Sequence, residues 1–191
     1  SQLLYDLQQK YSWPHTVTTC TGKNSKERVI EATRLLGDTL SVTMSVQSMS
    51  EDVLKNIKRD NIRLEDFRGI SEELAKKKRT RNAEVIAPLP GETLKSFFKG
   101  VADLLDTKVG RIQCHTLTMI YGTDYKDNEK FLKDYEYVTK FRIVVRNFTS
   151  IEGQPILDVE EVAIATKDMS FSDYKKMRKY TLNQWKGRMG S

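Results

Sequence analysis

The sequence has few of the residues from which self-contained metal or nucleophile sites are built. Its 191 residues include two cysteines, Cys20 and Cys114, and two histidines, His15 and His115. It contains no CxxC, HExxH, GxSxG, GxGxxG or GxxxxGK motif, which excludes the usual zinc, serine-hydrolase, dinucleotide and P-loop sites. Cys114 and His115 are neighbours on an expected strand, where adjacent side chains point to opposite faces. They therefore do not form a nucleophile–base pair, and both histidines are interpreted as structural.

Long apolar runs are also missing. No stretch approaches the roughly 20 apolar residues that a membrane-spanning helix needs. The opening SQLLYDLQQKYSWPH has neither the charged nor the apolar region of a signal peptide. We therefore expect no membrane contact and a cytoplasmic location in which both cysteines stay reduced.

Positive charge, in contrast, is in excess. The formal net charge is +6, and the densest basic run consists of Lys76, Lys77, Lys78, Arg79 and Arg81. Such a run can meet nucleic-acid phosphates, but it also ends an expected helix, whose C-terminus favours cations. A solvated helix end is the favoured interpretation, and nucleic-acid binding remains the alternative.

The first 125 residues alternate between short apolar runs and amphipathic helical stretches, which predicts β/α units on a parallel sheet. Strands are expected at residues 15–20, 40–46, 83–89 and 111–121, and helices at 3–9, 24–36, 50–57, 64–74 and 94–105. The second of these strands has an apolar face and a polar face, and Ser45 and Gln47 lie on the polar face near its C-terminal end. Parallel α/β folds bind ligands at that end of their strands.

The pattern changes after the last of these strands. Residues 137–148 and 156–165 predict a β-hairpin, and Ser170, with Asp173 three residues later, predicts the capped start of a closing helix. We therefore predict an α/β domain over residues 1–125 and a small α+β extension over residues 126–191.

Two strand ends carry sequence motifs. The first is Ser45-Val46-Gln47-Ser48, followed by Ser50, Val53-Leu54-Lys55 and Arg59, and the second is the apolar run Val85 to Leu89 followed by Pro90-Gly91-Glu92-Thr93. In this order and at this separation, the two motifs resemble the fourth- and fifth-strand motifs of radical S-adenosylmethionine (SAM) enzymes. The resemblance covers most of residues 1–125.

The resemblance implies the fold and the cofactors of that family. The fold would be the C-terminal portion of a partial (β/α)6, TIM-like barrel. The cofactors would be SAM and a 4Fe-4S cluster, at which a flavodoxin- or ferredoxin-type reductant drives cleavage of SAM to a 5′-deoxyadenosyl radical. That radical serves C–H functionalisation, methylation or methylthiolation of a substrate that the sequence does not identify.

The resemblance also implies which residues contact SAM. Ser45 and Gln47 would meet its ribose or methionyl part, Arg59 would pair with its carboxylate, and the backbone of the second loop would lie against adenine. The full implied set is Ser45, Gln47, Ser48, Arg59, Leu89, Pro90 and Gly91. Pro88 departs from the pattern, because many relatives have glycine there.

The cluster motif CxxxCxxC is absent from the sequence. We therefore expect the chain to be a C-terminal part of a longer enzyme whose first strands carry the cluster ligands, and we expect it to be inactive by itself. The order of the C-terminal elements is similar to that of radical enzymes with an N-terminal cobalamin-binding domain, which adds cobalamin to the expected cofactors. The tRNA methylthiotransferases share both strand-end motifs and remain the alternative subfamily.

Two other functions fit the residues. One is a non-catalytic basic module that binds RNA or a protein partner. The other is a different α/β-barrel enzyme that uses Glu84, Glu92 and Lys23 for acid–base chemistry.

Overall fold

The computed structural model describes residues 1–20, 26–59, 65, 68–69, 72, 81–107 and 109–186. It divides into two compact units, Ser1–Val85 with Phe98–Gln113 and Ile86–Phe97 with Cys114–Ser191. Lys23, Asn24 and the basic residues 76–79 lie outside the described residues, as does most of the helix expected over residues 64–74. The predicted domain boundary at residue 125 is a different division and stays a prediction.

Four strands form one sheet. Their order is β1 (Val17–Cys20), β2 (Leu40–Gln47), β3 (Arg81–Ala87) and β4 (Arg111–Thr116). Both β1–β2 and β2–β3 are parallel pairs. The prediction of an α/β fold with parallel strands is therefore confirmed, although the described strands form an open sheet and do not close into a barrel.

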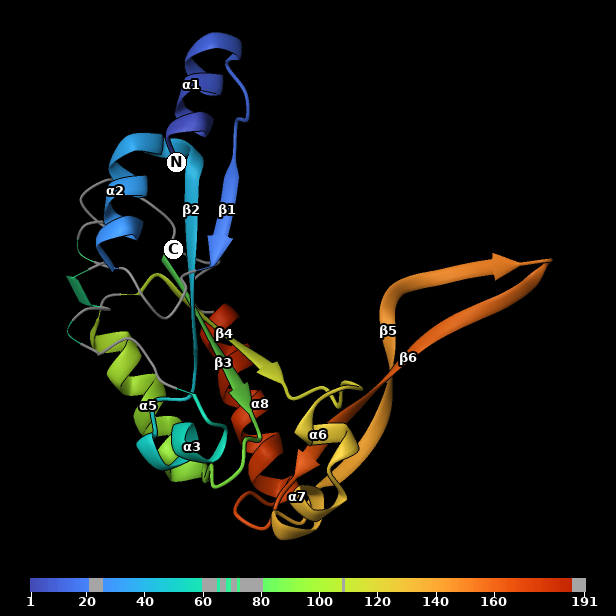
Figure 1. The fold of residues 1–191 in the computed structure, drawn as a ribbon. Coiled ribbons are helices and arrows are strands. Elements are labelled where there is room, and N and C mark those ends of the chain that lie inside the picture. The colour runs from blue at the N-terminus through green and yellow to red at the C-terminus, as the bar shows by residue number, and fades with distance from the viewer. Residues whose placement is uncertain are drawn as a thin grey trace. The chain divides into compact units, whose positions relative to one another are not determined.

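Helices α1 (Gln2–Tyr11) and α2 (Lys26–Leu36) run beside β1 and β2 in the first unit (Figure 1). The 3-10 turn η1 (Gly37–Thr39) joins α2 to β2, and the Gln8 side-chain amide donates a 2.8 Å hydrogen bond to the Thr39 hydroxyl. After β2 comes the short helix α3 (Glu51–Asn56). The described elements of this unit therefore follow the expected strand–helix alternation.

The second unit holds the hairpin and the closing helix. Strands β5 (Val138–Ile151) and β6 (Gln154–Ala165) form a long antiparallel ribbon (Figure 1). Helix α8 (Phe171–Lys186) follows, and Ser170 caps it, because the Asp173 amide donates a 3.1 Å hydrogen bond to the Ser170 hydroxyl. Both predictions, the hairpin and the cap, are confirmed.

The region between β4 and β5 differs from the prediction. Strand β4 ends at Thr116 instead of Tyr121, because the chain beyond it pairs with β6: Thr118 forms a bridge to Val162, and the Met119 amide donates to the Glu161 carbonyl at 2.9 Å. Two short helices that the sequence pattern does not show follow, α6 (Asp124–Asp127) and α7 (Glu129–Asp134). The helix expected over residues 94–105 is present as α5 (Leu94–Asp106).

None of the described helices has the length and the apolar surface that crossing a bilayer requires.

Candidate functional site

The alternating faces of β2 are present as predicted. The apolar face is buried, with Leu40, Val42, Met44 and Val46 at most 6% exposed. Ser45 therefore lies on the other face, because side chains alternate along a regular strand. Gln47 is the last residue of the strand and is 9% exposed. The predicted alternation does not extend to Gln47, because the register shifts after Ser45 and pairs Gln47 with Val85, a residue of the buried face.

Ser45 has a charged neighbour on β3. The register of the parallel pair places Glu84 opposite Ser45, and the Ser45 hydroxyl donates a 3.1 Å hydrogen bond to the Glu84 carboxylate. The sequence predicts Glu84 only as an acid–base candidate and not as a SAM contact. The sequence signal for it is a lone acid within the otherwise apolar run from Ala83 to Ala87, between Ala83 and Val85, which are buried.

Gln47 has an unusual backbone. Its φ is 67°, in the left-handed region that residues other than glycine rarely adopt. The Ser48 amide donates a 2.9 Å hydrogen bond back to the Val46 carbonyl, and this i to i+2 bond around a positive φ is typical of the rare and strained γ-turn. The pairing of β2 with β3 is also irregular between Ser45 and Gln47. The sequence does not predict this turn, since residues 46–48 include neither glycine nor asparagine.

Ser48 and Arg59 occupy the two ends of the segment that contains α3. Ser48 is buried, and its hydroxyl accepts a 3.1 Å hydrogen bond from the Ser50 amide just before the helix. Lys58 has a φ of 53°, and the Arg59 amide donates a 2.9 Å hydrogen bond to the Leu54 carbonyl. These are the features of a Schellman helix end, which fixes the backbone of Arg59.

The second loop is a β-turn followed directly by a capped helix. Leu89 and Pro90 are buried, Gly91 has a φ of 82°, and the Glu92 amide donates a 3.0 Å hydrogen bond to the Leu89 carbonyl. Proline second and a positive-φ glycine third define a type II turn, in which the glycine is required. Because Gly91 has no side chain, another group can approach the backbone of this turn closely.

Helix α5 begins immediately after this turn. The Ser96 amide donates to the Thr93 hydroxyl at 3.0 Å, and the Thr93 amide donates to the Ser96 hydroxyl at 2.9 Å. The Ser96 hydroxyl also donates to the carboxylate of Glu92, which is 1% exposed. The Glu92 side chain is thus part of the helix start, which argues against its use as an acid–base group.

The predicted contact residues fall into two sets. Ser45, Gln47, Ser48 and Arg59 belong to the first unit, and Leu89, Pro90 and Gly91 belong to the second. Within its own unit each set lies at or after the C-terminal end of a strand. Their roles toward SAM stay predictions.

The described residues do not fit an iron–sulfur cluster. Such a cluster takes cysteine thiolates as ligands, and both cysteines here are free, with Cys20 exposed. Burial raises the pKa of Cys114 to about 12, against a smaller opposing effect of Arg178. Within the described ranges, no three histidine, cysteine or acidic side chains come together as metal ligands. Cys114 is therefore a neutral thiol, and the part of the chain that the structure describes offers no cluster site.

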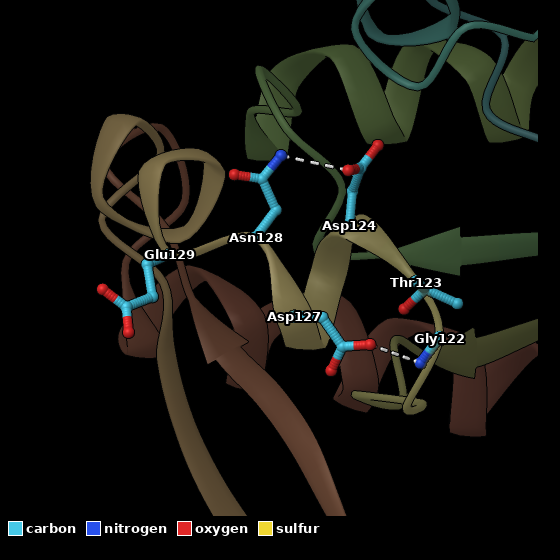
Figure 2. Close-up of a pocket in the computed structure, with 6 residues that line it drawn as sticks. All are labelled: Gly122, Thr123, Asp124, Asp127, Asn128 and Glu129. Atoms are coloured by element: carbon cyan, nitrogen blue, oxygen red, sulfur yellow. Dashed lines mark hydrogen bonds between the residues drawn. The ribbon is translucent and has the colours of Figure 1, made fainter.

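An open pocket in the second unit is lined by Gly122, Thr123, Asp124, Asp127, Asn128 and Glu129 (Figure 2). Its polar groups stabilise the loop itself. The Asp127 carboxylate accepts a 2.6 Å bond from the Gly122 amide, and the Asn128 amide donates to Asp124 at 3.0 Å. Figure 2 shows Glu129 directed away from Asp127. The pocket is therefore a structured surface loop, and we assign it no ligand.

Two curated proteins are similar to the chain. Over 96 residues it is 34% identical to the cobalamin-dependent radical SAM methyltransferase TokK of Streptomyces tokunonensis, an alignment that covers 49% of this chain and 14% of that protein. Over 109 residues it is 32% identical to the 2-(S-pantetheinyl)-carbapenam-3-carboxylate methyltransferase of Streptantibioticus cattleyicolor, which covers 56% of this chain and 16% of that protein. The alignments thus span a small part of each relative's length. No family model matches the chain. By these two sequence relationships, the chain is related to the radical SAM superfamily.

Proposed function

We propose that this chain supplies part of the SAM-binding surface of a radical SAM methyltransferase built on a partial (β/α) barrel. The observation that carries this proposal is the hydrogen bond between Ser45, near the C-terminal end of β2, and Glu84, in the middle of β3. A hydroxyl and a carboxylate side by side suit the two hydroxyls of a ribose, since each can accept a hydrogen bond. The name of one similar methyltransferase, TokK, supports the choice of cofactor.

The other contact residues fit the remaining parts of SAM. Gln47, in its strained turn, would present its amide beside the ribose, and Ser48 would contact SAM through the backbone of the same turn. The Arg59 guanidinium would pair with the methionyl carboxylate, for which its planar fork is well suited. Leu89, Pro90 and Gly91 would lie against adenine, because a turn without a side chain at Gly91 permits close approach.

The whole reaction needs groups that this sequence does not contain. The proposed reaction is reductive cleavage of SAM at a 4Fe-4S cluster, driven by a flavodoxin- or ferredoxin-type reductant, and the resulting radical serves methylation of an unidentified substrate. The cluster ligands would come from residues outside this sequence. The name of one relative adds cobalamin to the proposed cofactors. We also propose a cytoplasmic location, in keeping with two free cysteines.

Calorimetric titration of the full chain with SAM tests the proposal, with Gln47→Asn as the variant. Asparagine tolerates a positive φ, so a loss of affinity reports the position of the amide and not backbone strain. Losing one hydrogen bond predicts roughly three- to tenfold weaker binding. Gln9→Asn, on the exposed surface of α1, is the matched control and should bind like the parent. Salt-dependent binding of RNA without SAM binding would instead support the basic-module alternative.

A further inference from the structure

The strained turn at Gln47 requires support from its surroundings. A residue other than glycine that is held at positive φ is strained, and this conformation persists only where neighbouring contacts determine it. Two supports are local, the Ser48 amide bonded to the Val46 carbonyl at 2.9 Å and the Ser48 hydroxyl accepting the Ser50 amide at 3.1 Å. Neither of these two hydrogen bonds involves Met49, which lies between Ser48 and Ser50.

Met49 packs against Gly100 of α5 within the same unit. A Cβ atom built on Gly100 would lie 3.0 Å from the Met49 Cβ and 3.6 Å from the Met49 amide nitrogen. The first distance is shorter than most Cβ contacts, so Met49 would have to move by a few tenths of an ångström, and its Cβ cannot move without its backbone. Gly100 is buried in the middle of a helix, where glycine is less favourable than alanine. The close approach of the two backbones accounts for its presence.

We infer that Gly100 is a positioning residue for Gln47. Because Gly100 has no side chain, α5 packs closely against the Cβ atom and the amide nitrogen of Met49. This packing fixes the turn that presents the Gln47 amide. Any side chain at position 100 pushes Met49, and the displacement passes to Ser48 and Gln47, which are one and two residues away. The consequence for SAM rests on the proposed function, whereas the consequence for the turn does not.

Hydrogen–deuterium exchange of the Ser48 amide in the full chain measures the turn without any cofactor. Gly100→Ala should increase the exchange of this amide, because the bond to Val46 is disturbed. Combining it with Met49→Gly, which removes the Cβ at 3.0 Å, should restore protection. Combining it with Met49→Ala, which keeps that Cβ, should not. Lys95→Ala, an exposed substitution in the same helix, should exchange like the parent.

SAM titration of the same variants supplies the second measurement. Overpacking of this kind predicts about tenfold weaker binding for Gly100→Ala, recovered in the combination with Met49→Gly. Unchanged exchange at Ser48 in folded Gly100→Ala overturns the inference, and so does unfolding of this variant that Met49→Gly does not reverse. If the parent chain does not bind SAM, the proposed function fails, while the exchange data still decide the role of Gly100.

Discussion

Ser45 and Glu84 face each other across the parallel pair of β2 and β3, with the hydroxyl 3.1 Å from the carboxylate. Because each strand alternates, the same register places Ala83 and Val85 on the opposite face, where both are buried. The face opposite these buried residues thus carries a polar pair, near the C-terminal end of β2 and in the middle of β3. In this part of the proposed SAM surface, a hydrogen bond joins side chains from two neighbouring strands.

Glu84→Gln tests this pair. The substitution keeps the size of the side chain but removes the charge, so it weakens a hydrogen bond from a ribose hydroxyl. We expect about tenfold weaker SAM binding by calorimetry, since hydrogen bonds to charged groups contribute roughly 1.5–3 kcal/mol. Glu31→Gln, an exposed acid on α2, is the control. Equal losses in the two variants would mean that net charge, and not the pair, determines affinity.

The two motif loops differ in how far their sequences predict their structures. Pro90 and Gly91 each restrict the backbone in a known way, so the turn and the start of α5 follow from local chemistry. The turn at Gln47 does not, because it depends on packing between Met49 and Gly100, which are distant in the sequence. The buried face of β2 could be predicted because it depends only on the local alternation of apolar and polar residues. The early end of β4 reflects pairing with β6, which no local pattern of residues 111–121 encodes.

Anaerobic reconstitution with iron and sulfide tests whether the chain lacks a cluster site. We expect no stable brown species, because Cys114 is a buried neutral thiol and Cys20 is exposed. The measurement is the visible absorbance of the desalted protein, together with its iron content. The double variant Cys20→Ser, Cys114→Ser serves as the blank. Stable iron and sulfide in the parent but not in this blank would show that the two cysteines hold a cluster.

The ribbon predicts a tendency to self-associate. One face carries five exposed apolar side chains, which are Phe141, Ile143, Phe148, Leu157 and Val159. Such a patch favours association in water, so Phe141→Lys should lower the concentration-dependent light scattering of the chain. Thr149→Lys adds the same charge to the opposite face of the ribbon and should change the scattering less. A similar decrease in both variants would assign the effect to charge alone.

Cys114 should make the stability of the fold sensitive to alkaline pH. Its pKa is raised from an ordinary value of 9.0 to about 12, mainly by burial, so the folded chain keeps the proton that the unfolded chain loses. Above about pH 9 the unfolded state therefore binds fewer protons, and the free energy of unfolding falls as the pH rises toward 12. Other groups titrate in this range. The informative quantity is therefore the difference in the free energy of unfolding between the parent and Cys114→Ala, measured by urea denaturation at each pH. This difference should be constant below pH 8 and should then shift in favour of the alanine variant. A pH-independent difference for Cys114→Ala would contradict the raised pKa.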